Sequence, residues 1–118
     1  MRATRMYIKE VDSPQLMSKM DDNDDLVIID VREMHEISRG TIQGAVAMPM
    51  ATVPVRLDDI PKDKEVIFIC RSGARSGQVC MFLGQHGYEN VFNLRGGMIG
   101  WVRSGYEPVL PEQPSNIY

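Results

Sequence analysis

The sequence predicts one α/β domain with a central, mainly parallel five-stranded sheet and helices on both of its faces. Two short runs, residues 26–29 and 66–69, are continuously apolar, which is typical of strands buried on both sides. Segments with a helical pattern separate the expected strands, and this alternation favours right-handed crossovers between parallel strands. Ligands of such sheets bind beyond the carboxyl ends of the strands.

The first third of the chain predicts a strand, a helix and a second strand. The first strand is expected at residues 7–11. Because Ser13 stands directly before Pro14, we expect Ser13 to be the N-cap and Pro14 the first residue of a helix that ends near residue 20. An acidic turn then leads into the buried strand that ends at Asp30.

The remaining elements follow from the same apolar periods and from glycines that end helices, such as Gly40 and Gly87. They are, in chain order, a helix at 33–39, a strand at 45–48, a helical turn or two at 52–57, a strand at 66–69, a helix at 75–86, a strand at 91–94 and a helix at 97–104. We expect Trp101, in the last helix, to cover the core rather than to bind a ligand.

The composition is that of a single globular domain. The chain has 118 residues, of which 43% are hydrophobic and 25% charged, enough for one core. We expect one domain over residues 1–118, with its core at about 7–108, a loose N-terminus and a loose tail at 109–118. The net charge of −3 argues against a nucleic-acid partner, and no run reaches the length of a membrane span or a signal peptide. We therefore expect no nucleic-acid or membrane partner and a cytoplasmic location.

The two cysteines have neither a metal-ligand spacing nor the number needed for a disulfide scaffold, which predicts free thiols in a reducing compartment. Cys80 falls among Val79, Phe82 and Leu83 in an expected helix, so we interpret it as a core residue. The alternative is a resolving cysteine, which requires that Cys80 reach Cys70 with disulfide geometry.

Cys70 opens a polar loop, CRSGARS at residues 70–76, between a buried strand and a helix. Backbone N–H groups at such a loop and the helix dipole stabilise a thiolate and any anion beside it, and Arg71 and Arg75 add positive charge. These surroundings lower a thiol pKa, so we interpret Cys70 as a nucleophile. The alternative is an inert buried thiol, but glycine, serine and arginine make a poor core environment.

Asp30 and Arg32 follow the neighbouring buried strand, at the same edge of the sheet as Cys70. Asp30 could brace the active loop, or it could serve as a helix N-cap or turn residue, since each role uses the same carboxylate. Glu33, His35 and Glu36 have the residue types of acid–base or metal sites. Because they lie on one short charged helix, and because the two histidines, His35 and His86, are far apart in sequence, we do not expect an acid–base or metal role for them.

These features resemble the rhodanese-like sulfurtransferase domain over about residues 7–108. The resemblance rests on four ordered motifs: IDVRE at 29–33, GTIQGA at 40–45, the loop CRSGARS at 70–76, and GYENVFNLRGG at 87–97, which leads to Trp101. Members commonly carry a histidine where this chain has Thr41, a departure that bears on local packing and on the rim of the substrate site.

The resemblance implies a two-step sulfur transfer through a persulfide on Cys70, formed from thiosulfate or another persulfide and passed to an acceptor nucleophile. It implies that Asp30 and Arg32 support the loop, and that Arg75, together with Arg71, holds an anionic donor. No cofactor and no metal are implied. The donor would be a small sulfur anion or a low-molecular-weight persulfide, with a sulfur-carrier protein as a further candidate partner. The implied substrate-binding loop consists of Arg71, Ser72, Gly73, Ala74, Arg75 and Ser76.

Three other functions remain as alternatives. Cysteine phosphatases and arsenate reductases close a similar loop with arginine, but they use a longer spacing than the four residues between Cys70 and Arg75. Ile69, where many phosphatases have a histidine, also favours sulfur transfer. A non-catalytic rhodanese-like binding module often lacks the cysteine that this chain keeps. A protein-to-protein sulfur relay would use the same Cys70 persulfide.

Overall fold

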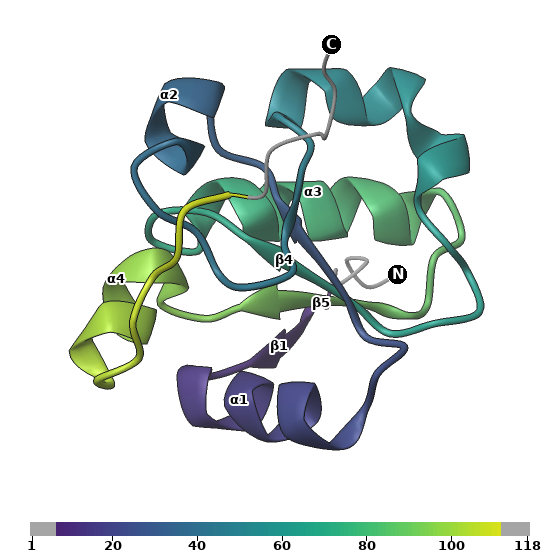
Figure 1. Ribbon diagram of the computed structural model, residues 1–118. Coiled ribbons are helices and arrows are strands. Elements are labelled where there is room, and N and C mark those ends of the chain that lie inside the picture. Colours follow the sequence, from purple (N-terminus) through teal and green to yellow (C-terminus); the bar gives the residue numbers. More distant parts are fainter. Residues whose placement is uncertain (1–6, 112–118) are drawn as a thin grey trace, which may run out of the picture.

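The computed structural model describes residues 7–111, which form a five-stranded sheet with the order β1-β5-β4-β2-β3 (Figure 1). Every strand pairing is parallel. The strands are β1 (Lys9–Val11), β2 (Val27–Asp30), β3 (Val46–Ala47), β4 (Val66–Ile69) and β5 (Val91–Leu94). The predicted fold class, with five parallel strands, is therefore confirmed.

Helices cover both faces of the sheet (Figure 1). On one face lie α1 (Ser13–Asp22) and α4 (Gly97–Arg103), which contact each other. On the other face lies α3 (Ala74–Gln85), which packs on β4, β5 and the 3-10 helix η1 (Met50–Val55). The remaining helical elements are α2 (Met34–Ile37) and a second 3-10 helix, η2 (Leu57–Asp59). No helix within residues 7–111 is long and apolar enough to cross a bilayer.

The central strand β4 explains the continuous apolar run of the sequence, because all four of its residues are fully buried. Phe68 packs in the core cluster under α3, whereas Ile67 and Ile69 pack in the cluster under α1 and α4. The sheet therefore has two separate apolar cores, one on each face. Trp101 is buried in the second core, as the sequence predicts, and its ring packs against Tyr106.

The first helix begins differently from the prediction, since its N-cap is Asp12 and not Ser13. The Asp12 carboxylate accepts a hydrogen bond from the Gln15 N–H, and the Gln15 side chain accepts one from the Asp12 N–H. This reciprocal capping box satisfies two N-terminal donors. A cap at Ser13 would place Leu16 at the reciprocating position, where no side-chain acceptor exists.

The short elements differ from the prediction in extent. The helix expected at 33–39 is only α2, and the strand expected at 45–48 is only β3. The helical turns expected at 52–57 are the 3-10 helices η1 and η2, since Pro54 lacks the N–H that a regular helix would need.

The segment expected to be loose from residue 109 starts with an ordered contact. Val109 forms an antiparallel bridge with Thr41, in which each backbone N–H donates to the other residue's carbonyl, at 2.7 and 2.8 Å. These bonds fasten the chain after α4 to the loop after α2. Of the two expected loose ends, residues 1–6 and 112–118 lie outside the described part of the chain.

A buried polar cluster occupies the carboxyl end of β2. The Asp30 carboxylate, which is fully buried, accepts hydrogen bonds from the Arg32 guanidinium and, at 2.7 Å, from the Thr41 hydroxyl. Arg32 also donates to the carbonyl of Gly40 at 2.7 Å. Thr41 thus contributes a hydroxyl donor to this cluster. The cluster ties β2 to the loop after α2.

We predict that Asp30→Ala destabilises the protein by about 3–5 kcal/mol, because it leaves the Arg32 guanidinium buried without its carboxylate. Urea-induced unfolding measures the loss. Should that variant not fold, Thr41→Val removes only one hydrogen bond and should cost about 1–2 kcal/mol. The exposed Asp24→Ala serves as the control; losses no larger than its own would contradict the assigned role of the cluster.

Candidate active site

The site begins where β4 ends, because Cys70 follows this strand and a short loop carries the chain into α3. Gly73 makes the turn possible with a φ of 101°, a left-handed conformation that favours glycine. A Cβ atom at Gly73 would also lie 3.2 Å from the carbonyl oxygen of Leu94. The turn directs the N–H of Gly73 toward the sulfur of Cys70.

The Cys70 sulfur lies within a set of hydrogen-bond donors and is almost completely buried. It accepts from the backbone N–H of Gly73 at 3.1 Å and from the hydroxyl of Ser76 at 3.2 Å. Burial alone would raise the pKa of the Cys70 thiol. The Ser76 hydroxyl and the backbone N–H groups of Ser76, Gly73 and Ser72 outweigh burial, so the pKa lies below its ordinary value of 9.0. The loop therefore favours the thiolate.

Asn93, on β5, competes with Cys70 for the hydroxyl proton of Ser76. The amide nitrogen of Asn93 donates to Gly73 O at 3.1 Å and to Glu10 at 3.0 Å, so its oxygen faces Ser76 as an acceptor. With a thiol, Ser76 can donate to Asn93 and accept from the S–H. With a thiolate, the charge-assisted bond to sulfur is the stronger one, and the hydroxyl turns to Cys70. Ser76 thus supplies a donor when the sulfur ionises.

The N-terminus of α4 binds the first two residues of the loop through backbone hydrogen bonds. The N–H groups of Met98 and Ile99 donate to the carbonyls of Cys70 and Arg71 at 2.9 and 3.0 Å. These bonds keep the two carbonyl oxygens away from the sulfur. The fit requires glycine at position 97, where a Cβ atom would lie 2.5 Å from the carbonyl oxygen of Arg71.

Arg75 has a partner that the sequence did not reveal. Its two terminal nitrogens donate to the two carboxylate oxygens of Glu36 at 2.8 and 2.9 Å. The Arg75 guanidinium holds the pKa of Glu36 at about 2, well below its ordinary value of 4.5. This bidentate pair joins the first turn of α3 to α2. Glu36 therefore supports the loop through Arg75, a role that the sequence did not indicate.

The structure places the predicted site residues Asp30 and Arg32 outside the loop itself. The side chains of Asp30 and Arg32 bind Gly40 and Thr41 and do not reach residues 71–76 through any hydrogen bond within the described chain. Arg71 is exposed at the rim.

Cys80 is a buried core thiol in this structure. Both cysteines are free, and Cys80 is buried on α3 beside Val79 and Leu83. Burial, together with the nearby charges of Glu10 and Cys70, raises the pKa of Cys80 to about 12. Cys80 therefore stays protonated at neutral pH, as a core residue should. No group of three or more potential metal-ligating side chains occurs among residues 7–111.

Three supporting residues, Asn93, Glu36 and Gly97, were not predicted as parts of the site. All lie outside the CRSGARS loop and reach it only through the fold. The NLRGG stretch at residues 93–97 was the available signal, because it contains both Asn93 and Gly97. No local pattern marks Glu36 as the partner of Arg75.

Comparison with known proteins identifies the family of this fold. Residues 13–104 match the family described as the rhodanese-like domain. A protein named "Sulfurtransferase" from Allochromatium vinosum is 46% identical over 105 residues, which cover 89% of this chain and 98% of that protein. A "Thiosulfate sulfurtransferase GlpE" from Glaesserella parasuis is 35% identical and covers 78% of this chain and 85% of its own length.

The fold also matches solved structures. A rhodanese-like domain protein from Staphylococcus aureus superposes with a TM-score of 0.79 at 29% identity, covering 89% of this chain and all of that one.

We predict that Ser76→Ala raises the pKa of Cys70, because the thiolate loses its hydroxyl donor. The pH dependence of alkylation of Cys70 by iodoacetamide, followed by peptide mapping, measures this pKa. The midpoint should lie below 9.0 in the unmodified protein and higher in the variant. Ser72→Ala, which keeps the backbone donor, is the matched control. The same midpoint in the Ser76 and Ser72 variants would contradict a role for the hydroxyl.

We predict that Glu36→Gln destabilises the protein by about 0.5–1 kcal/mol at neutral pH, since the pair with Arg75 is partly exposed. Because folding lowers the pKa of Glu36 from 4.5 to about 2, this stabilisation is complete above 4.5 and disappears as the pH falls toward 2. Urea unfolding at neutral pH and at about pH 3 measures the difference. A difference that stays constant, or that Glu89→Gln reproduces, would refute the assignment.

Proposed function

Because this chain belongs to the rhodanese-like domain family, we propose that it is a sulfurtransferase that carries a sulfane sulfur as a persulfide on Cys70. The observation that carries the proposal is that the Cys70 sulfur accepts hydrogen bonds from the Gly73 N–H and the Ser76 hydroxyl. These donors favour the thiolate without a general base. They can also face the negative terminal sulfur of a persulfide, which carries the same charge.

In the first step, the Cys70 thiolate attacks the outer sulfur of the donor. The bond between Cys70 Sγ and that sulfur forms while the sulfur–sulfur bond of the donor breaks. When the donor is thiosulfate, the leaving group is sulfite. When the donor is an organic persulfide, the leaving group is the corresponding thiolate. Charge is conserved, since one thiolate is replaced by one persulfide anion. The relatives named as a sulfurtransferase and a thiosulfate sulfurtransferase support this donor class.

In the second step, an acceptor nucleophile attacks the terminal sulfur and restores the Cys70 thiolate. Cyanide becomes thiocyanate and a thiolate becomes a persulfide, so neither step needs an oxidant or a cofactor. Two half-reactions on one residue predict ping-pong kinetics. A sulfur-carrier protein as acceptor would use the same persulfide, so a relay differs only in its partner. Two free thiols fit the cytoplasmic location that we propose.

The positive charge of the loop serves the anionic donor and leaving group. Arg71 is exposed beside Cys70 and forms no ion pair within residues 7–111, so it can bind the donor directly. Arg75 uses one N–H of each terminal nitrogen on Glu36, and its remaining donors can still face an anion. We propose that Arg75 combines both roles. The backbone N–H groups of residues 71–76 complete the anion site.

We predict that Cys70→Ser lowers thiosulfate-to-cyanide transfer at least about a thousandfold, because the nucleophile is lost. Cys80→Ala, which removes the other thiol, is the matched control and should keep most of the activity. Steady-state rates at varied concentrations of both substrates measure the transfer and show whether the plots are parallel, as ping-pong kinetics requires.

The unfolding midpoints of both variants establish that the fold persists. Substantial turnover in a folded Cys70→Ser variant would rule out the proposed intermediate. Loss of activity in a folded Cys80→Ala variant would show that the second thiol takes part.

A further inference from the structure

The Ser76 hydroxyl has one proton and two acceptors within reach. Its oxygen lies 3.2 Å from the Cys70 sulfur and also forms a hydrogen bond with the amide oxygen of Asn93. Because a hydroxyl carries a single proton, it donates to only one of these acceptors at a time. The preferred acceptor changes with the charge on the sulfur, and sulfur transfer changes that charge twice in each cycle.

Two acceptors fix the orientation of the Asn93 amide. Its nitrogen donates to the Glu10 carboxylate at 3.0 Å and to the carbonyl of Gly73 at 3.1 Å. A carboxylate and a carbonyl can only accept, so the amide nitrogen faces them and the amide oxygen faces Ser76. Both Asn93 and Ser76 are buried. The fold therefore supplies the hydroxyl with a fixed second acceptor beside the sulfur.

A persulfide moves the negative charge away from Ser76. In a persulfide the inner sulfur, Sγ of Cys70, is neutral and the outer sulfur carries the charge. Ser76 is fully buried, so it lies on the interior side of Sγ, whereas an acceptor reaches the outer sulfur from solvent. To face the outer sulfur, the hydroxyl would have to give up Asn93 and reach past Sγ. With the charge on Sγ gone, the amide oxygen of Asn93 is the better acceptor.

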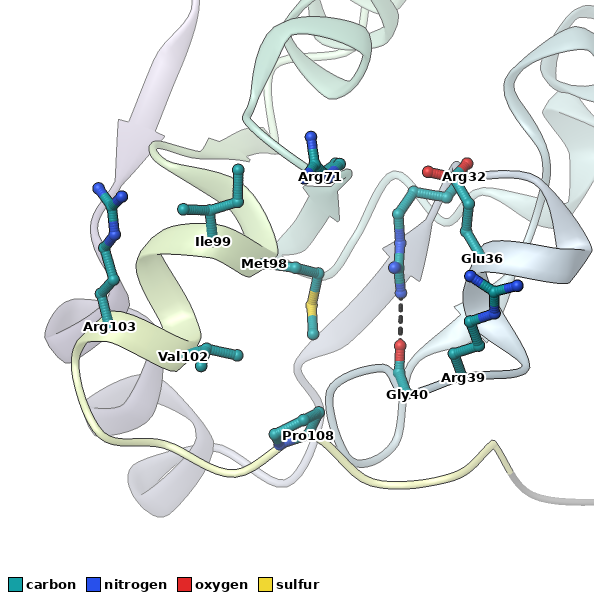
Figure 2. A pocket seen from close by; sticks show the side chains of 10 residues that line it. All are labelled: Arg32, Glu36, Arg39, Gly40, Arg71, Met98, Ile99, Val102, Arg103 and Pro108. Carbon is teal, nitrogen blue, oxygen red and sulfur yellow. Dashed lines mark hydrogen bonds between the residues drawn. The ribbon is translucent and has the colours of Figure 1, made fainter.

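The Asn93–Ser76 pair lies apart from the hollow of about 500 Å³ that opens between α4 and the loop after α2 (Figure 2). Arg71 lines this hollow, but neither Ser76 nor Asn93 does. A molecule held there would touch neither side chain. The pair is therefore placed to act on Sγ and not to bind a substrate.

We propose that Asn93 is a positioning residue that holds the Ser76 hydroxyl while Cys70 carries the sulfur and releases it to Sγ when the sulfur leaves. The inference rests on the proposed sulfur transfer and concerns its two half-reactions. In the second, the electron pair of the acceptor forms the bond to the outer sulfur, and the pair of the broken sulfur–sulfur bond stays on Sγ. The proton remains on Ser76 throughout, and only its hydrogen bond passes from Asn93 to Sγ.

This exchange gives the two residues opposite effects. The Ser76 hydroxyl stabilises Sγ as a leaving group, so it accelerates the discharge of sulfur to an acceptor. Asn93 replaces the hydrogen bond that the hydroxyl gives up when the thiolate attacks a donor, so it accelerates loading. Loss of either residue should therefore slow one half-reaction and spare the other.

The test measures the two half-reactions separately in the full chain, with thiosulfate as the donor and cyanide as the acceptor. In ping-pong kinetics, kcat/KM for thiosulfate reports the loading of Cys70 and kcat/KM for cyanide reports its discharge. The loading constant is divided by the fraction of thiolate, taken from the alkylation midpoint of each variant. The variants are Ser76→Ala and Asn93→Leu. Asn90→Leu is the matched control, because the Asn90 amide also binds two backbone carbonyls but lies just before β5, whereas Cys70 lies at the other end of the sheet.

Asn93→Leu should lower the loading constant about threefold to tenfold without slowing discharge, and Ser76→Ala should lower the discharge constant by a similar factor without slowing loading. Asn90→Leu should leave the ratio of the two constants unchanged. Equal losses of both constants in Asn93→Leu, as a loosened loop would cause, would overturn the inference.

A measurement on the unmodified protein decides the case if Asn93→Leu does not fold. The NMR resonance of the Asn93 Cγ is recorded with Cys70 as the thiolate and as the persulfide formed from thiosulfate. It should move to higher frequency in the persulfide, since accepting a hydrogen bond deshields a carbonyl carbon, and Ser76→Ala should abolish this change. The same change with and without the Ser76 hydroxyl, or no change in a protein whose mass shows the persulfide, would refute the inference alone. Absence of a Cys70 persulfide in the unmodified protein would instead refute the proposed function, and this inference with it.

Discussion

The structure depends on one constraint: the peptide groups after Cys70 must direct their N–H groups inward at the sulfur. A loop in which the carbonyls faced the sulfur would repel a thiolate. Two features prevent this arrangement. Gly73 adopts the left-handed turn that directs its N–H to Cys70, and α4 binds the carbonyls of Cys70 and Arg71 from the other side. The lowered pKa of Cys70 therefore depends on backbone direction and on the Ser76 hydroxyl, and on no charged side chain.

The sheet and the helices on it both position the residues around the Cys70 sulfur. The buried strand β4 fixes where Cys70 lies, and β5 supplies Asn93, which binds both Gly73 and Ser76. Glu36 from α2 holds Arg75 in the first turn of α3. Burial of the sulfur opposes ionisation, so these donors must be in place for the thiolate to form.

The fold, and the course of the chain from a buried strand through the Cys70 loop into a helix, could be predicted from the sequence, because both leave local patterns. The apolar runs around Ile28 and Phe68 predict buried parallel strands, and Cys70 with its glycine, serine and arginine neighbours predicts an anion loop. The supports could not be predicted in the same way. Glu36 lies 39 positions from Arg75 and pairs with it only through the tertiary fold. The N-cap at Asp12 was missed because adjacent serine and proline gave a competing local signal.

The central claim is that Cys70 itself carries the transferred sulfur, and the most direct test is the intact mass of the reduced protein after brief exposure to thiosulfate. The account predicts a gain of one sulfur atom, located on Cys70 by peptide mapping and removed by cyanide. The Cys70→Ser variant should show no gain. No added sulfur from thiosulfate or from glutathione persulfide, or added sulfur located on Cys80, would contradict the account.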